Sequence, residues 1–523
     1  ASSKADRTPR MLFASLSDGT GPAQVLLGAG NGATAAIRQI LDQVGEVPAT
    51  TWIKVDVVRD IVRRAEVDPE QPLDLPRSLY GLAFDGTLGL AFLPEELVAY
   101  TLVNSDHELQ PPNIARQRRA FDAMERLVQG LGREAIDLFR FSTSSYFAEG
   151  DELLPLYRGH RRFDQLSPEL LLESALAGAR YLIRATGEDG RFDYAYRPKT
   201  DESNDDYNIL RHAGTLYSML EVYEVAPEAE LLAAAERALG YLRRAIRPCA
   251  VGSVQAACVV EKDFVKLGGN ALAIVALAKH AEVTGNGQHR ALIDDLGAWI
   301  LASQNEDGEF TLHKLHMERD RPESFVSQFY PGEALLALLR GGGSAPRWLG
   351  GAARGAHWLI DVRDRTVPEA RLNHDHWLLY ALNELYRRQP NPLYLRHTRR
   401  ITDAILERQN LRPTYPDWSG STYRPPRSTP TATRSEGLAA AYRLERDFGD
   451  PLAAQRILGG LLRGIRFQLR TQFRPESVLY LRDPQRALGG FRYSLTDYEI
   501  RIDYVQHNIS ALLALRRILI AQK

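Results

Sequence analysis

The pattern of apolar and polar residues changes character about a third of the way along the chain. Over about Met11–Phe147, short apolar runs alternate with turn residues, which is typical of strands with helices between them. After Ser167 the apolar residues recur at the three- and four-residue spacing of amphipathic helices. The sequence therefore predicts an α/β (α+β) N-terminal domain at 1–150, a linker at 151–166 and a mainly helical domain at 167–523.

Helix starts recur at intervals through the helical domain. Proline at the first helical position is a start signal, because its missing N–H would be unpaired there in any residue. Three such prolines follow a capping residue, namely Ser167, Asn391 or Asp450. The six expected starts lie at or near Pro168, Pro227, His289, Pro346, Pro392 and Pro451.

Each start opens the same arrangement of two helices. The first helix has one apolar stripe and runs into a long polar loop, and the second helix is apolar nearly all round. A helix with one stripe packs on the outside of a domain, whereas a uniformly apolar helix is buried. Six outer and six inner helices predict a closed (α/α)6 toroid. The expected inner helices are 210–223, 268–281, 332–340, 376–386, 436–445 and 506–519.

Three of the long loops carry a glycine turn followed by an aromatic residue, at Glu188–Phe192, Gln304–Phe310 and Gly489–Phe491. This turn resembles the helix-ending turn of the αα-toroid superfamily, which includes terpene cyclases and prenyltransferases. The six-hairpin glycosidases share the architecture. The resemblance implies the fold of about two thirds of the chain and no particular family, because the acid motif of terpene cyclases and the Cys–His pairing of lanthionine cyclases are absent. The turn itself has a structural role, in which glycine ends a helix and the aromatic ring packs on it.

The glycine-rich segment Leu27–Gly32 in the N-terminal domain suggests a phosphate loop. It lacks the Lys-Ser/Thr ending of a Walker motif and the full dinucleotide glycine pattern, so it predicts a tight strand-to-helix turn. We therefore expect the N-terminal domain to pack beside the toroid without contributing catalytic groups.

Composition narrows the partners of the protein. The formal net charge is −1, with basic residues spread along the chain, so we expect no nucleic-acid partner. No apolar run approaches the roughly 20 residues of a membrane span. Cys249 and Cys258 are compatible with a disulfide in an exported protein or two thiols in a cytoplasmic one, and both locations stay open. The sequence indicates no cofactor and no oligomeric state.

The toroid prediction places the candidate site. All long loops from outer to inner helices lie at one end, so the residues before each inner helix converge on one funnel. These positions are rich in carboxylates, histidine, arginine and aromatic residues, whereas the opposite turns carry ordinary turn residues. The expected catalytic residues are Asp206, Glu333, Asp375 and Glu436. The expected substrate-binding residues are Asp205, Tyr207, Arg211, His212, Tyr330, His374, His376, Trp377, Arg434, Asp503, Tyr504 and His507.

Carboxylates beside tyrosine and tryptophan suit a glycan or other small-molecule substrate, since aromatic faces stack on sugar rings. Glycoside hydrolysis needs one carboxylic acid and one carboxylate, so the sequence predicts a glycoside hydrolase acting on a poly- or oligosaccharide. Helix dipoles favour ionised Glu333 and Glu436 as base or nucleophile, and Asp375 is then the expected acid.

Three alternatives remain open. A polysaccharide lyase or sugar epimerase would use the mouth histidines with a tyrosine as partner acid. A metal held by His374, His376, Asp375 and Glu333 is less favoured, because alternate residues of a helix diverge by about 200°, and no metal is expected. The third alternative is a non-catalytic module that binds a peptide or glycan at the same mouth.

Overall fold

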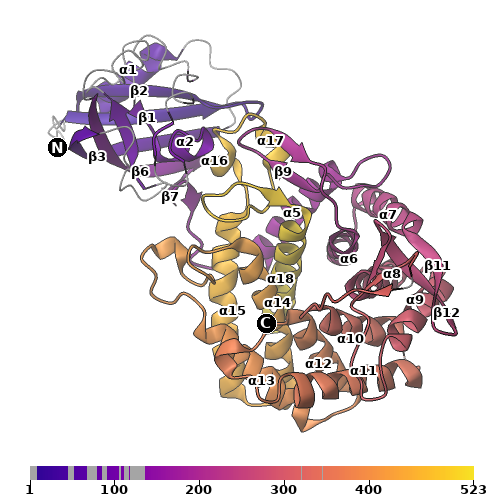
Figure 1. The fold of residues 1–523 in the computed structure, drawn as a ribbon. Coiled ribbons are helices and arrows are strands. Elements are labelled where there is room, and N and C mark those ends of the chain that lie inside the picture. Colours follow the sequence, from indigo (N-terminus) through magenta and orange to yellow (C-terminus); the bar gives the residue numbers. More distant parts are fainter. Residues whose placement is uncertain are drawn as a thin grey trace.

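The structure is a computed structural model that describes residues 9–44, 52–67, 79–84, 91–104, 108–110, 113, 117, 136–319, 321–343 and 345–522. It has an N-terminal sheet and a larger helical domain (Figure 1). Among the described residues, no helix is both long and apolar enough to cross a membrane.

The N-terminal domain is an antiparallel sheet in the strand order β2-β1-β3-β6-β4-β5, which β7 and β8 extend beside β6. The strand β2 ends at Gly32, whose φ of 98° makes the sharp turn into α1, so the predicted strand-to-helix turn is confirmed. Residues 151–166, expected to form a linker, belong instead to the N-terminal sheet, because they contain β7 and β8. The elements are β1 (Pro9–Ser17), β2 (Gln24–Asn31), α1 (Ala33–Gln43), β3 (Trp52–Val67), β4 (Gly81–Phe84), β5 (Ala91–Phe92), α2 (Pro94–Ala99), β6 (Ile136–Glu149), β7 (Glu152–Tyr157) and β8 (His160–Arg161).

The helical domain is a ring of inner helices inside a ring of outer helices. Each inner helix contacts the next, and α18 contacts α6, so the ring closes and the predicted (α/α)6 toroid is confirmed. The inner helices are α6 (Ile209–Val225), α8 (Leu267–Thr284), α10 (Tyr330–Gly341), α12 (His376–Arg388), α14 (Ser428–Phe448) and α18 (Ile502–Ile520). The outer helices are α5 (Pro168–Ala185), α7 (Ala229–Arg244), α9 (Arg290–Ala302), α11 (Pro346–Trp358), α13 (Pro392–Glu407) and α15 (Pro451–Thr471).

Local sequence explains where the outer helices begin. The Oγ of Ser167 accepts a hydrogen bond from the Leu170 N–H at 3.2 Å, and Asn391 and Asp450 cap α13 and α15 in the same way. Each such cap contributes about 1 kcal/mol to the stability of its helix. The start signals in the sequence are therefore the caps of the folded protein.

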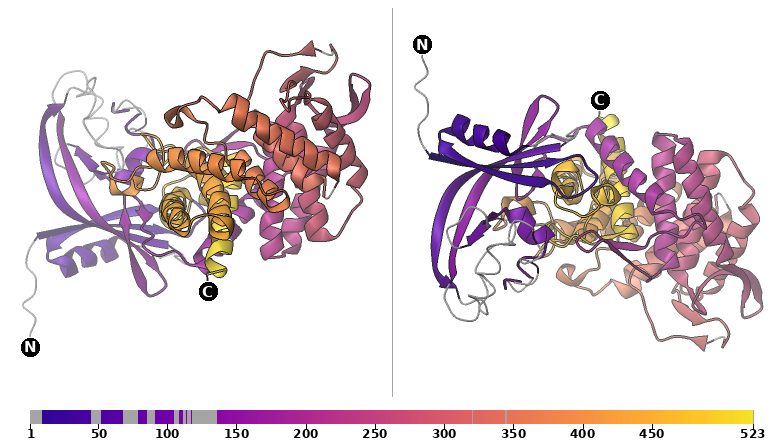
Figure 2. Two further views of the ribbon diagram at one scale, coloured as in Figure 1. Left: turned by 90° about the horizontal axis from the view of Figure 1, so that it is seen from below. Right: turned by 90° about the horizontal axis from the view of Figure 1, so that it is seen from above.

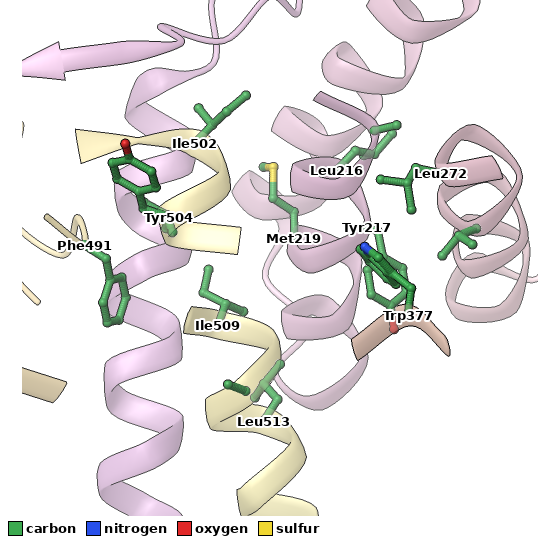
Figure 3. Close-up of a cluster of buried hydrophobic side chains, with 14 of the residues drawn as sticks. Leu216, Tyr217, Met219, Leu272, Trp377, Phe491, Ile502, Tyr504, Ile509 and Leu513 are labelled. Carbon is green, nitrogen blue, oxygen red and sulfur yellow. The ribbon is translucent and has the colours of Figure 1, made fainter. Parts of the chain in front are cut away.

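Burial separates the two rings as the hydrophobic pattern predicts. In α8 every residue from Leu267 to Leu277 is buried, whereas α15 buries one stripe that includes Ile457, Leu461 and Ile465. Figure 3 shows buried apolar side chains of α6, α8, α12 and α18 in the interior of the ring. The interior of the ring is thus packed with side chains over these helices.

The long loops contain small sheets that the hydrophobic pattern does not predict. They lie between outer and inner helices, so the helical core itself has no strand among its described residues. A disulfide joins Cys249 of β11 to Cys258 of β12. The strands of these sheets are β9 (Ala195–Arg197), β10 (Glu202–Asn204), β11 (Ile246–Val251), β12 (Val254–Glu261), β13 (Phe264–Lys266), β14 (Lys314–His316), β15 (Arg321–Pro322) and β16 (Ile500–Arg501). The remaining short helices are η3 (Leu359–Arg363), η4 (Glu369–Arg371), η5 (Pro416–Trp418), α16 (Pro475–Val478) and α17 (Pro484–Ala487).

The N-terminal sheet packs on the toroid where β3 and β8 contact α16 (Figures 1 and 2). The Ala23 N–H donates to the Leu479 carbonyl oxygen at 2.6 Å. The fully buried ammonium of Lys54 lies 2.8 Å from Asp56 and 3.4 Å from the Tyr480 hydroxyl. The Lys54–Asp56 pair lies within β3 and compensates the buried charge, and the contacts to Leu479 and Tyr480 join the sheet to the toroid.

Candidate functional site

A cavity of about 660 Å³ opens at the end of the toroid where the long loops lie. All six inner helices contribute to its wall, from Leu272 of α8 to His507 of α18. Its described lining begins at Asn208, so no described residue of the N-terminal sheet reaches it. As far as the described residues show, the cavity therefore belongs to the toroid.

Ten of the residues expected at the mouth line this cavity. They come from the ends of five inner helices, so the inference from loop position holds for them. The ten are Arg211, Tyr330, Glu333, His374, His376, Trp377, Arg434, Asp503, Tyr504 and His507.

Four expected residues near the start of α6 lie elsewhere. Asp206 is exposed and accepts a hydrogen bond from Asn204 at 3.2 Å, outside the cavity lining. Asp205 and Tyr207 line a second cavity of about 420 Å³ beside α7. Asp205 and Asp206 precede the capping residue of α6, so the chain there has not yet turned toward the axis.

His212 is the fourth of these residues, and it lies inside the helical core. Its ring is fully buried, 2.6 Å from the Tyr207 hydroxyl and 2.8 Å from the Ala238 carbonyl oxygen. Burial lowers the pKa of His212 to about 4, so the ring stays neutral. It holds α6 against α7, which is a structural role.

Two histidines, His376 and His507, lie side by side in the wall of the cavity. The rings of His376 and His507 meet edge to face with centroids 5.2 Å apart, and Trp377 packs against His376. His376 is 3% exposed, yet neither ring nitrogen has a hydrogen-bond partner among the described residues. Burial and the charges of His507 and Arg434 hold the pKa of His376 well below its ordinary value. His376 is therefore a neutral base facing the cavity.

Glu436 lies behind His507 and is absent from the cavity lining. Its Oε1 is 2.7 Å from Nδ1 of His507, and its Oε2 accepts a hydrogen bond from the Tyr380 hydroxyl at 3.1 Å. A carboxylate only accepts, so Nδ1 of His507 carries the proton and Nε2 is left for a ligand. Burial raises the pKa of Glu436, against the opposing effect of His507. The expected catalytic carboxylate is thus the partner that orients a histidine.

Glu333 and Asp375 form a second group of buried acids. Glu333 lines the cavity at 3% exposure, and its Oε2 has no hydrogen-bond partner among the described residues. Burial and the nearby charge of Asp375 raise the pKa of Glu333 well above its ordinary value. The expected ionised state of Glu333 is wrong, because desolvation outweighs the helix dipole.

Asp375 lies below the cavity wall with no exposed surface. Its Oδ1 accepts a hydrogen bond from the Leu378 N–H at 3.1 Å, which caps α12. Burial raises its pKa to about 7. Asp375 is therefore held partly protonated, as predicted, but it caps a helix and does not line the cavity.

Asp503 is the ionised carboxylate of the cavity. Arg501 donates two hydrogen bonds of 2.5 and 2.9 Å to its carboxylate, and Nε of Arg211 lies 3.2 Å from Oδ2. These cations keep the pKa of Asp503 below its ordinary value although the side chain is buried. Arg501 was not among the expected residues, although it stands two positions before Asp503 at the start of α18.

Several lining residues before α14 were also missed. The sequence pattern places this inner helix at 436–445, but α14 begins at Ser428. The stretch Thr429–Thr433 contains a proline and three threonines, and such residues are poor helix formers in a helix interior. Pro430 is tolerated because it lies in the first turn. Arg427 and Tyr423 therefore lie at the cavity.

The grouping of possible metal ligands differs from the alternative weighed from sequence. Ligand atoms of His376, Glu436 and His507 lie within 4.8 Å of one another. His374 does not belong to this group, and its Nδ1 accepts a hydrogen bond from Arg434 at 2.7 Å. The proton on Nδ1 of His507 makes the hydrogen bond to Glu436, which favours proton chemistry at this group.

Comparison of the sequence with protein-family models and with curated proteins finds no match. Comparison with solved structures finds D-mannose isomerase, with TM-score 0.50 and 15% identity over 67% of this chain and 97% of that one. Cellobiose 2-epimerase from Bacillus thermoamylovorans B4167 has TM-score 0.50 and 12% identity over 67% of this chain and 100% of that one. An α-1,6-mannanase from Salegentibacter sp. HEL1_6 has TM-score 0.47 and 12% identity, covering 67% and 99%. The helical domain thus shares the αα-toroid fold of D-mannose isomerase and cellobiose 2-epimerase.

Proposed function

We propose that this protein is a carbohydrate-active enzyme that moves a proton on a sugar, as an isomerase or an epimerase. One observation carries the proposal: a buried histidine, His376, faces the cavity and His507 with both ring nitrogens unpartnered among the described residues. A buried polar group without a partner is costly, and a ligand would supply the missing partner. The named activities of D-mannose isomerase and cellobiose 2-epimerase, which share the fold, support this reaction class.

The two histidines have complementary roles in such a reaction. His376, held neutral, removes the proton from the sugar carbon beside the carbonyl group, and the C–H electrons form the double bond of an enediol. His507, in the form that carries a proton on both ring nitrogens, donates from Nε2 to the carbonyl oxygen and keeps its Nδ1 hydrogen bond to Glu436. It recovers that proton from a hydroxyl oxygen of the enediol when the carbonyl group forms again. Return of the proton to either carbon or either face completes the reaction, so no oxidant or reductant is consumed.

Proton exchange with solvent tests the proposal directly. The full chain is incubated in deuterium oxide with neutral reducing hexoses, cellobiose and hexuronates, and C2 deuteration is followed by nuclear magnetic resonance. We expect deuterium at C2 of at least one sugar, with no change after dialysis against a chelator. Absence of exchange in the whole panel, or dependence on an added metal, would contradict the proposal.

A glycoside hydrolase is the second candidate, favoured by Glu333 and Asp503. Burial keeps Glu333 protonated, as a general acid requires, and Arg501 and Arg211 keep Asp503 ionised, as a base or nucleophile requires. Release of new reducing ends from oligosaccharides, lost in Glu333→Gln, would establish this candidate in place of the isomerase.

A further inference from the structure

The cavity holds more positive than negative charge. Six arginines line it, against the two carboxylates Glu333 and Asp503, and burial keeps Glu333 neutral. Arg211 and Arg501 both pair with Asp503, whose single negative charge compensates one of their two positive charges. The other four arginines therefore hold most of the excess positive charge, and they are Arg371, Arg408, Arg427 and Arg434.

Three of these arginines, Arg408, Arg427 and Arg434, surround Tyr423. The guanidinium carbons of Arg427 and Arg434 lie 5.6 and 5.1 Å from the centre of the Tyr423 ring. The charges of all three lower the pKa of Tyr423, after the hydrogen bond from Arg434. The three cations therefore act on one small region of the wall.

None of the three makes an ion pair with a carboxylate in the part of the chain that the structure describes. Arg434 donates to Nδ1 of His374 at 2.7 Å and to the Pro430 carbonyl oxygen at 2.8 Å. Arg408 donates to the Ala370 carbonyl oxygen. Neutral acceptors orient these guanidinium groups but leave their charge uncompensated.

We infer that Arg408, Arg427 and Arg434 form an anion subsite that holds a carboxylate, sulfate or phosphate group of the sugar substrate. The inference rests on the proposed function and narrows its substrate class to an acidic sugar. Clustered cations with fixed guanidinium planes are the usual protein partner of such groups, which they bind through paired N–H donors. The charge of Arg434 also reaches His374 and His376, whose pKa values it lowers, so the anionic group binds near the histidines.

Binding to the full chain tests the subsite without requiring turnover. Calorimetric titrations compare D-glucose, D-glucuronate, glucose 6-phosphate and inorganic phosphate at low and high salt. We expect at least one acidic sugar to bind 10-fold or more tightly than glucose, and this advantage to shrink at high salt. Preference for glucuronate or for glucose 6-phosphate would distinguish a carboxylate from a phosphate as the natural group.

Two variants and one control locate the binding. Arg427→Gln and Arg434→Gln should each weaken binding of the acidic sugar about 10-fold while leaving glucose unchanged. Arg347→Gln, on the exposed face of outer helix α11, should leave both unchanged. Because Arg427 is exposed and makes no hydrogen bond with its side chain among those described, its variant should fold even if Arg434→Gln does not.

Equal affinity for glucose and both acidic sugars would overturn the subsite, as would acidic-sugar binding that is unchanged in Arg427→Gln. Inorganic phosphate binding as tightly as glucose 6-phosphate would also overturn it, by showing an adventitious ion only. The proposed function fails separately. If an acidic sugar binds through these arginines but never exchanges its C2 proton, the anion subsite is supported and the isomerase or epimerase activity is contradicted.

Discussion

Two groups of acid–base residues lie in or directly behind the wall of one cavity, and they differ in how they are supported. On α12 and α18, His376 and His507 face each other, and Glu436 orients His507 from behind. On α10 and at the start of α12, Glu333 and Asp375 each keep one oxygen without a hydrogen-bond partner in the described structure. An orienting carboxylate fixes the tautomer that a proton-transfer residue needs, whereas burial alone only keeps an acid neutral. The histidine group is therefore suited to repeated proton transfer, whereas the environment of Glu333 and Asp375 favours their protonated forms.

The largest effect should follow removal of the histidines. His376→Asn and His507→Asn should each lower kcat for C2 proton exchange by about 1,000-fold, within the 10²–10⁴-fold range of general acid–base catalysis. The melting temperature, measured by circular dichroism, should fall little, since neither ring fills a purely apolar site. Retention of more than half the exchange rate in both variants would assign the chemistry to the carboxylate group instead.

Loss of the orienting carboxylate should have a smaller effect. Glu436→Gln keeps the shape of the side chain but replaces the carboxylate that accepts the Nδ1 hydrogen bond of His507, so we expect kcat to fall about 10- to 100-fold. The KM should change less than kcat, and the pH dependence of kcat should shift because Glu436, whose pKa is raised by burial, no longer titrates. An unchanged pH profile would reduce Glu436 to a packing role.

Glu333 separates the two candidate functions. If proton transfer by the histidines is the reaction, Glu333→Gln should lower kcat by no more than about 10-fold, because an amide still donates a hydrogen bond. If hydrolysis is the reaction, the same variant should lose about 1,000-fold or more, since no proton can reach the leaving group. The exposed carboxylate Asp206, outside the cavity, offers the matched control Asp206→Asn, which should keep full activity.

The smallest effect concerns stability and pH. The pKa of Asp375 is about 7 in the folded protein and near 3.8 in the unfolded chain. A raised folded-state pKa stabilises the protein below the unfolded value, and this contribution is lost as the pH rises through about 7. Asp375→Asn keeps the capping oxygen and should flatten the dependence between pH 4 and 8, with a gain at pH 8 on the order of 2 to 4 kcal/mol.

Urea unfolding at pH 5 and pH 8 measures this difference in the free energy of unfolding. Asp206→Asn again serves as the control, because that carboxylate is exposed. A variant that is less stable than the wild type at pH 8 would show that the Asp375 charge is compensated in the folded state.

Much of the fold follows from the sequence for local reasons. Capping residues such as Ser167 and Asp450 bond the first N–H groups of their own helices, so they act within a few residues. The apolar pattern that distinguishes inner from outer helices is also local, because it depends on residues three and four positions apart. The start of α14 was missed because Pro430 and its neighbouring threonines resemble a loop, and their helical state depends on packing in the toroid mouth.

The sequence by itself determined the (α/α)6 ring, the end at which polar residues gather, and ten of the residues that line the cavity. Only the tertiary structure decided which of those residues face one another. Glu436 and His507 are 71 residues apart and meet because α14 and α18 are neighbours in the closed ring. The direction of each side chain and its depth of burial depend on such neighbours. Burial in turn decided that Glu333 is protonated where its place at a helix start favours a charge, because desolvation of a carboxylate costs more than a helix dipole returns.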